Sequence, residues 1–294
     1  MINTFFIILP LFVLMAGGMF FARLYSLSEE TLSRGLTDFF MPLLVFVSLY
    51  ESDIHPQEML AIAGAAVFMV FFMLIAGVLY CKAAKTAVPA FAMPVVFMNS
   101  GFLGIPLMQL WGGTEAMNYI VIYDEVQTLF LFTLGLFMAQ GGISLKKAAE
   151  AVKSPILWAV LLGFACNIWK IPLPAPLIST FHFGGAAAPP LAAFTLGCSL
   201  RTGINRLSFH TAAGVLLRTA VGFCSGLAAA WLFNLQGTAA VVVIVAGALP
   251  AAVFSYVLPA RYGAARTYTR DIVVLSTLLS IITIPGAFYA ASLL

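Results

Sequence analysis

Long apolar runs recur along the whole length of this 294-residue chain. A helix needs about 20 residues to cross the roughly 30 Å hydrocarbon core of a bilayer, and ten stretches come close to that length. These stretches are 4–22, 35–51, 58–81, 88–111, 117–140, 154–170, 186–201, 211–234, 238–260 and 271–293. The first has no basic residue before its apolar run and is too long for a signal peptide, so we interpret it as a spanning helix. The sequence therefore predicts an all-α polytopic membrane protein with ten transmembrane helices.

The shortage of charged residues excludes whole classes of protein. Only 9% of the residues are charged and 62% are hydrophobic, whereas a soluble domain has about 25% charged residues. So few charges cannot cover a water-soluble surface, which excludes a soluble enzyme, a nucleic-acid-binding protein and a disordered chain. The four cysteines form no CxxC pair and the three histidines lie far apart. We therefore expect no metal site and no cofactor.

The basic residues sort by loop. Twelve of the fourteen Lys and Arg residues fall in alternate loops. These loops are 22–34, 82–87, 141–153, 201–210 and 261–270. The intervening loops contain only Lys170, and Arg218 lies inside a span. The positive-inside rule then predicts that the basic loops are cytoplasmic and that both termini lie on the extracytoplasmic side of the cell inner (plasma) membrane.

The chain divides into two halves of five expected spans each. Residues 1–140 form the first half, 141–153 a cytoplasmic linker and 154–294 the second half. An odd number of spans gives the halves opposite orientations, as in transporters built from inverted repeats. The halves also echo one another, since Gln127 corresponds to Ser276 at an offset of 149 residues. This organisation predicts a binding site at the midplane between the halves.

Proline and glycine interrupt the fourth and ninth spans. The fourth contains the stretch MPVVFMNSGFLGIP at 93–106, in which Asn99 lies about 16 Å from the start of the span. The expected break residues are Pro94, Gly104, Pro106, Pro250 and Pro259. Proline removes a backbone donor, and unpaired backbone groups are tolerated in lipid only where protein or a water-filled cavity satisfies them. Two such helices at equivalent places predict a binding site, although prolines that merely kink each helix are the alternative.

At these residues the chain resembles the auxin efflux carrier family, which includes bacterial malate and malonate permeases. The resemblance rests on FFMPLLVF at 39–46, NSGFLGIPL at 99–107, Gln127, and GALPAAVFSYVLPARYG at 247–263. It implies ten helices in two inverted five-helix repeats, with broken helices four and nine crossing. It also implies that Asn99 and Gln127 face an organic anion, and the dimers formed by plant relatives imply a candidate homodimer. Members are described as uniporters and as proton- or sodium-coupled carriers, so coupling to H⁺ or Na⁺ stays open.

The candidate substrate-binding residues supply hydrogen-bond donors or room for a ligand. Side-chain amides donate, half-helix N-termini attract anions, and glycine lets a ligand approach the backbone. The set is Asn99, Ser100, Gly101, Gln127, Thr128, Pro250, Ala251, Ser255 and Tyr256. For the amides, glycines and hydroxyls the alternative role is helix–helix packing.

Three charged residues are candidates for a proton or cation site or a charge relay. A carboxylate inside a span is costly and marks an ion pathway or a paired charge, which makes Asp124 a candidate proton or cation site. For Arg218 we consider snorkelling, attraction of anions to an inner vestibule, or pairing with Asp38. Glu125 points elsewhere on the same helix and is expected to be structural or to line a vestibule.

These features favour a secondary transporter over an enzyme. We expect it to move a small organic anion, a mono- or dicarboxylate such as malate or malonate, by alternating access at the midplane crossover. The first two helices of each half would form a scaffold. The alternatives are a sodium-coupled symporter of the bile-acid type, a channel and an intramembrane enzyme. The expected partners are the substrate and the lipid bilayer, and no nucleic acid.

Overall fold

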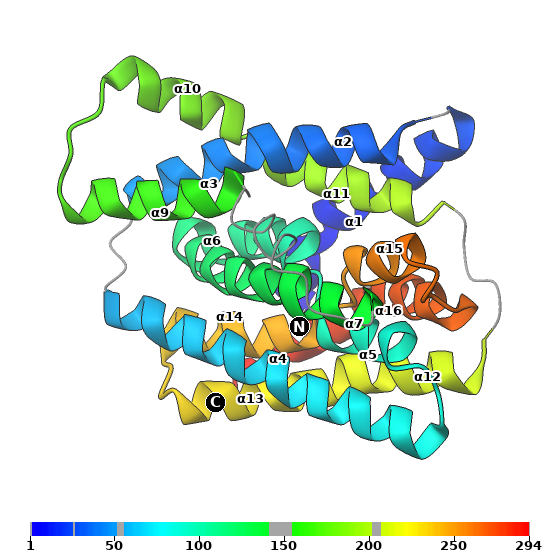
Figure 1. Ribbon diagram of the computed structural model, residues 1–294. Coiled ribbons are helices and arrows are strands. Elements are labelled where there is room, and N and C mark those ends of the chain that lie inside the picture. Colours follow the sequence, from blue (N-terminus) through cyan, green and yellow to red (C-terminus); the bar gives the residue numbers. More distant parts are fainter. Residues whose placement is uncertain (1, 26, 52–55, 141–154, 202–206, 294) are drawn as a thin grey trace.

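The computed structural model describes residues 2–25, 27–51, 56–140, 155–201 and 207–293, and these residues are helical almost throughout (Figure 1). The expected linker at 141–153 lies outside them. The first half contains α1 (Ile2–Leu24), α2 (Glu29–Gly35), η1 (Leu36–Phe40), α3 (Met41–Tyr50), α4 (Pro56–Ala84), α5 (Val88–Val96), η2 (Ser100–Gly104), α6 (Ile105–Phe130), η3 (Leu131–Gly135) and α7 (Leu136–Gln140). The second half contains α9 (Pro155–Ile168), α10 (Ala175–Gly185), α11 (Ala188–Ser199), α12 (Phe209–Leu216), η4 (Leu217–Val221), α13 (Gly222–Leu232), α14 (Gly237–Ala248), α15 (Phe254–Arg261) and α16 (Thr267–Ala291).

Several of these helices have the length and apolarity to cross a membrane. Within the described residues, five stretches meet both conditions by length and composition. They are Thr31–Tyr50, Gln57–Ala84, Ser100–Ala139, Phe209–Leu232 and Thr267–Ala291. Three shorter apolar helices cover Leu9–Leu24, Trp158–Ile168 and Gly237–Ala248. The chain is therefore a multi-pass membrane protein, while the count of ten spans and the inverted repeats stay predictions.

The seventh expected span, 186–201, contains helix α11 (Ala188–Ser199). Helix α10 precedes it, and only a short turn separates α10 from α11. Gly184 and Gly185 form the end of α10, which packs on α3. A Cβ on Gly185 would lie 2.8 Å from Leu44 Cα. These glycines therefore permit close packing of the end of α10 on α3.

The helices form two groups. The upper group comprises α1, α2, η1, α3, α9, α10 and α11, in which α1 packs on α11 and α3 packs on α9 and α10. The lower group comprises α4–α7 and α12–α16, in which α4 packs on α5, α6 and α13, while α16 packs on α12 and α14. Figure 1 shows α2, α3, α9 and α10 along one side, α4, α12 and α13 along the other, and α6 between them. The upper group contains the first two expected helices of each half.

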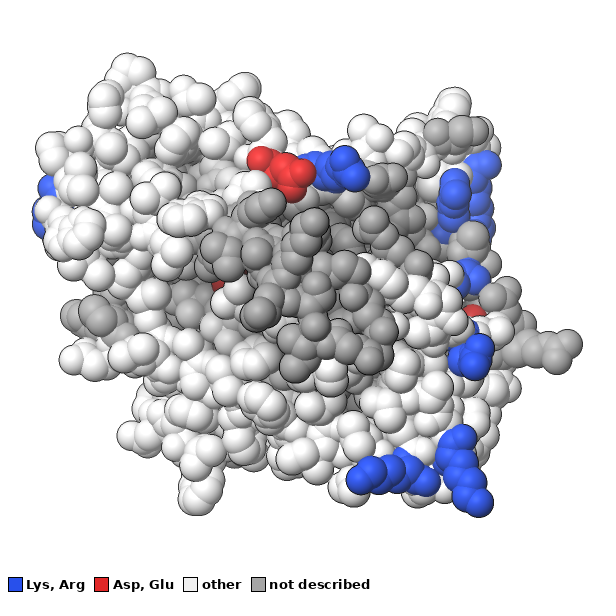
Figure 2. Space-filling model, in the orientation of Figure 1, with Lys and Arg blue, Asp and Glu red and all other residues white. Residues whose placement is uncertain are grey.

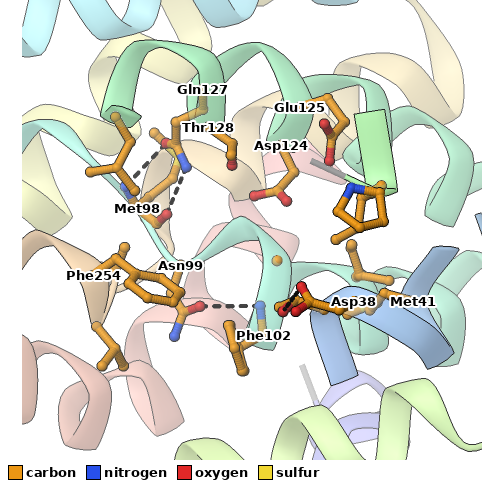
Figure 3. Close-up of a pocket in the computed structure, with 18 residues that line it drawn as sticks. Asp38, Met41, Met98, Asn99, Phe102, Asp124, Glu125, Gln127, Thr128 and Phe254 are labelled. Carbon is orange, nitrogen blue, oxygen red and sulfur yellow. Dashed lines mark hydrogen bonds between the residues drawn. The ribbon is translucent and has the colours of Figure 1, made fainter. Parts of the chain in front are cut away.

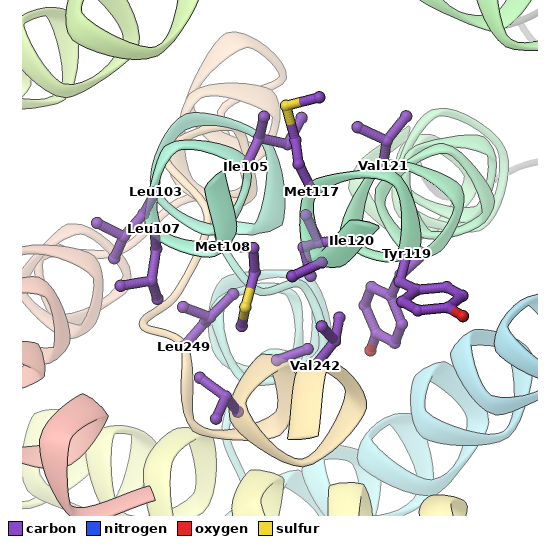
Figure 4. Close-up of a cluster of buried hydrophobic side chains, with 14 of the residues drawn as sticks. Leu103, Ile105, Leu107, Met108, Met117, Tyr119, Ile120, Val121, Val242 and Leu249 are labelled. Atoms are coloured by element: carbon purple, nitrogen blue, oxygen red, sulfur yellow. The ribbon is translucent and has the colours of Figure 1, made fainter. Parts of the chain in front are cut away.

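A buried apolar cluster joins η2 and α6 to α14 (Figure 4). Leu103 and Leu107 are fully buried, as are Val242 and Leu249 from the other half of the chain. Lipid supplies as apolar an environment as these side chains do, so the contact is stabilised by close packing and not by exclusion of water. The cluster holds the end of α14 against the start of α6.

The charged residues lie mainly at the ends of the molecule. On the face drawn in Figure 2, Lys and Arg gather mostly at one end, with a smaller group at the opposite end. In the chain, Arg23 ends α1, Lys82 lies in the last turn of α4 and Arg266 precedes α16. These positions belong to the loops expected to be cytoplasmic. The side of the membrane that each end faces stays a prediction.

Candidate functional site

Two helices break at mid-chain positions of the two halves, and the breaks pair with one another. Helix α5 ends at Val96 and α14 ends at Ala248, and both chains then run extended. Met98 and Ala251 form an isolated antiparallel bridge. The Asn99 N–H donates to the Pro250 carbonyl at 2.8 Å, and the Ala252 N–H donates to the Phe97 carbonyl at 2.9 Å. Each break thus satisfies part of the backbone that the other exposes, as a lipid environment requires.

The breaks occur in the two helices that the sequence indicated, but the prolines contribute unequally. Of the five expected break residues, Pro250 alone lies in an extended segment. Pro94 lies inside α5, Pro259 lies inside α15, and Pro106 lies in the first turn of α6. Gly104 ends η2, where a Cβ would lie 3.0 Å from Leu249 Cδ1. Because η2 runs directly into α6, Pro106 lies inside a continuous helical run, where its missing N–H leaves a backbone carbonyl of η2 without a helical donor.

Gln127 on α6 supports the first break. Its Oε1 accepts the Met98 N–H at 3.1 Å, while its Nε2 donates to the Met98 carbonyl at 2.7 Å and to Ser100 Oγ at 2.8 Å. An amide nitrogen has two hydrogens, so both donors are already used. On α16, Ser276 Oγ accepts the Ala251 N–H of the second break at 3.1 Å. Gln127 and Ser276, which correspond in the two halves of the sequence, therefore each accept a backbone N–H from one break.

Arg218 forms hydrogen bonds with the backbone at both breaks. It lies in the π-helical segment η4 and is fully buried. Its Nη1 donates to the carbonyls of Val95 and Val96, at 2.7 and 3.1 Å, and its Nη2 donates to the Gly247 carbonyl at 2.8 Å. A positive charge is favourable at helix C-termini, and here one guanidinium serves the ends of both α5 and α14. Arg218 thus neither snorkels nor forms an ion pair with Asp38 in the described structure.

A cavity of about 330 Å³ lies in front of the breaks (Figure 3). Its lining residues are Thr37, Asp38, Met41, Met98, Asn99, Gly101, Phe102, Ile105, Asp124, Glu125, Gln127, Thr128, Leu131, Pro155, Ile156, Ala252, Val253 and Phe254. The upper group contributes η1, α3 and α9, and the lower group contributes both breaks and α6. The cavity therefore lies between the two helix groups, and its size is at the small end of the range for ligand sites.

Asn99 provides an unused hydrogen-bond donor at this cavity. The side chain is only 3% exposed, and its Oδ1 caps η2 by accepting the Phe102 N–H at 3.2 Å (Figure 3). Its buried Nδ2 has no hydrogen-bond partner among the described residues. A buried donor without a partner costs free energy. A ligand with an acceptor atom in the cavity would remove that cost. The first turns of η2 and α15, which hold Gly101 and Phe254, also line the cavity with their positive dipole ends.

Three carboxylates share the same cavity. Asp124 Oδ1 accepts from Ser100 Oγ at 2.6 Å, and Asp38 Oδ1 accepts from Thr37 Oγ1 at 3.1 Å. Glu125 is 5% exposed and also lines the cavity, close to Asp124 in Figure 3. Within the described part of the chain, no Lys or Arg lines it. The described residues also contain no group of three or more His, Cys, Asp or Glu placed to hold a metal ion.

The structure brings together only part of the expected substrate-binding set. Asn99, Gly101, Gln127 and Thr128 line the cavity. The remaining members, Ser100, Pro250, Ala251, Ser255 and Tyr256, are absent from its described lining. Ser255 Oγ donates to the carbonyl of Ala252 in its own turn, and the Pro250 carbonyl is used by the bridge.

Other cavity residues were missed by the sequence analysis. Thr37, Phe102, Ile156 and Phe254 line the cavity beside the expected residues. Phe102 and Phe254 come from the two half-helices, and their rings lie 6.2 Å apart. Each follows a break within a few residues, which was the available signal for them. Ile156 had no such signal because α9 reaches the cavity only through its packing on α3.

Comparison with known sequences matches the chain to membrane transport proteins. The family described as "Membrane transport protein" matches it twice, over residues 4–148 and 142–288. An uncharacterized transporter of Methanothermobacter thermautotrophicus is 27% identical over 289 residues, covering 95% of each chain. The uncharacterized transporter YfdV of Escherichia coli is 24% identical over 311 aligned residues, covering 99% of each chain. The similarity therefore extends over both halves and nearly the full length.

Proposed function

Because this chain belongs to the membrane transport protein family of the auxin efflux carriers, we propose that it is a secondary transporter for a small organic anion. The proposed substrate is a mono- or dicarboxylate such as malate or malonate. It binds in the cavity at the crossing of the two broken helices. A cavity of about 330 Å³ has room for a molecule of this size.

The unpaired Nδ2 of Asn99 carries this proposal. A substrate carboxylate accepts from that donor and lies against the positive ends of η2 and α15. Gly101 has no side chain to block the approach to the η2 backbone. Gln127 acts as a strut for the Met98 backbone, since both of its N–H donors are used there. Thr128 supplies a hydroxyl on the same wall.

The position of the cavity supports alternating access. Its walls come from both helix groups, so movement of one group against the other opens it to one side of the membrane at a time. The upper group is the proposed scaffold. The lower group contains both breaks and Arg218, which ties α5, α14 and η4 together by hydrogen bonds. The crossover and its bound anion therefore move as one unit.

The test is malonate and malate uptake into proteoliposomes, with Asn99→Asp as the main variant. Aspartate keeps the oxygen that caps Phe102 and replaces the Nδ2 donor by an acceptor. We expect at least about tenfold weaker apparent affinity for malonate, equivalent to about 1.4 kcal/mol, together with a lower melting temperature, because the new carboxylate joins three others in the cavity. Asn99→Ser, which also keeps a capping oxygen but adds no charge, should show a similar loss of affinity with a melting temperature close to wild type.

The matched control is Gln236→Ala, which removes an exposed amide outside the cavity. It should transport as wild type does. Unchanged affinity in Asn99→Asp would contradict the assigned anion site. If no small carboxylate raises the melting temperature of the wild-type protein, the proposed substrate class is wrong, because a ligand that binds the folded state stabilises it.

A further inference from the structure

We propose, resting on the function above, that each anion enters the cavity together with one positive charge and that the Asp124 carboxylate holds this charge. The charge has three chemical sources, which are a proton, a sodium ion, or an ammonium group on the substrate itself. Each of these sources requires the protein to provide an anionic oxygen, beside the anion site, that is not already neutralised by another group.

The charges around the cavity make a lone anion unfavourable there. Three carboxylates line the wall, and no described lining residue is basic. Arg218 is the buried cation of the crossover, but its guanidinium is bonded to carbonyls at the ends of α5 and α14. Like charges repel strongly where water is scarce, and ionisable groups within a membrane mark ion or proton pathways. An added positive charge removes this repulsion.

Asp124 is the carboxylate connected to the crossover. Its Oδ1 accepts from Ser100 Oγ, and the same hydroxyl accepts from Gln127 Nε2, which also holds Met98. No described residue donates to Asp124 Oδ2. The η2 backbone lies close by, since a Cβ on Gly101 would be 3.1 Å from that oxygen. Asp124 is therefore connected to the first break through its hydrogen bond with Ser100, and its Oδ2 has no described donor.

The other two carboxylates lack this connection. Asp38 on η1 is exposed and belongs to the upper group, and its described hydrogen bond comes from Thr37 of the same segment. Glu125 lies on α6 beside Asp124 but has no described hydrogen bond to η2. The remaining cavity walls, from α9, α15 and the first break, contribute no titratable side chain among the described residues. Asp124 is thus the cavity carboxylate that shares hydrogen bonds with the first break, which also carries Asn99.

The experiment measures labelled malonate uptake into proteoliposomes with the membrane voltage clamped by potassium and valinomycin. Inward proton and sodium gradients are imposed separately, and uptake of a labelled small amino acid is measured in parallel. Wild-type protein should show about tenfold faster malonate uptake with one of the gradients or, where the charge is an ammonium group, should transport the amino acid itself about tenfold faster than malonate. Asp124→Asn should remove that response, while malonate still raises the melting temperature of the variant.

Glu115→Gln is the matched control, since Glu115 is an exposed carboxylate on the same helix outside the cavity. It should keep the wild-type response. Wild-type malonate uptake that ignores both gradients, with no faster transport of the amino acid, would overturn the proposal, as would a gradient response that persists in Asp124→Asn. Absence of any malonate binding by wild-type protein would instead contradict the proposed function, so the two failures are distinguishable.

Discussion

The two helix breaks share one backbone geometry but differ in chemistry. In both, an α-helix ends, the chain runs extended through one bridge residue, and a new helical segment begins. In both, a polar side chain from the last long helix of that half accepts the N–H of the bridge residue. The first break is nevertheless rich in polar side chains, with Asn99, Ser100 and Asp124. The second presents Ala251 and Ala252.

This difference indicates that the two halves contribute different groups to the cavity. The second break supplies backbone, namely the carbonyl of Pro250 and the N–H of Ala252, and it supplies the first turn of α15. The first break supplies the same backbone and also the groups proposed to recognise a ligand. We therefore propose that the similar backbone of the two breaks serves movement, while selectivity depends on the first half. Three experiments test how far the symmetry extends, in decreasing order of expected effect.

The largest effect is expected for Arg218→Met, since this residue serves both breaks. The variant leaves three carbonyls, of Val95, Val96 and Gly247, without their donor. An unsatisfied buried group costs about 1–3 kcal/mol, so we expect a loss of at least about 3 kcal/mol, measured by thermal unfolding in detergent. Arg218→Lys should be intermediate, because an ammonium keeps the charge but lacks the planar fork. Wild-type stability in Arg218→Met would show that the breaks do not depend on this clamp.

A smaller and unequal effect is expected for the two supporting side chains. Gln127→Leu removes three hydrogen bonds around Met98 and Ser100, and Ser276→Ala removes the acceptor of Ala251. With about 0.6–1 kcal/mol for each hydrogen bond in a membrane protein, we expect losses of about 2–3 and about 1 kcal/mol. Unfolding of both variants under identical conditions measures the ratio. Equal losses would show that the second break is supported as strongly as the first.

The smallest effect is expected for Gly104→Ala, where the two halves touch. The added methyl group would lie 3.0 Å from Leu249 Cδ1 and 3.2 Å from Ile120 Cγ1. Leu249 Cδ1 is the end of a side chain that can rotate, whereas Ile120 Cγ1 belongs to a stiffer β-branched side chain, so we expect a cost of about 1 kcal/mol. Gly17→Ala is the control, because a Cβ there meets nothing within 4 Å. A difference above about 3 kcal/mol between the two variants would show that Leu249 cannot move.

The positions of the breaks could be predicted because their causes are local. Pro250, and the run of Asn99, Ser100 and Gly101, interrupt apolar helices in the printed sequence. The partners of these residues could not be predicted in the same way. Gln127 was expected to hold substrate, yet its donors support Met98. For Arg218 the sequence left snorkelling, an inner vestibule and pairing with Asp38 open, yet the residue lies at the ends of two other helices.

The sequence by itself determined that this chain lies in a membrane, that it is helical, and that the helices around Asn99 and Pro250 are interrupted. These properties follow from apolar run lengths, scarce charge and the missing N–H of proline, each of which acts within a few residues. The tertiary structure decided which unpaired backbone groups meet, where the charge of Arg218 is used, and which carboxylates share a cavity. The physical reason is that hydrogen bonds and charges act through space, between residues as far apart in the chain as Arg218 and Val95.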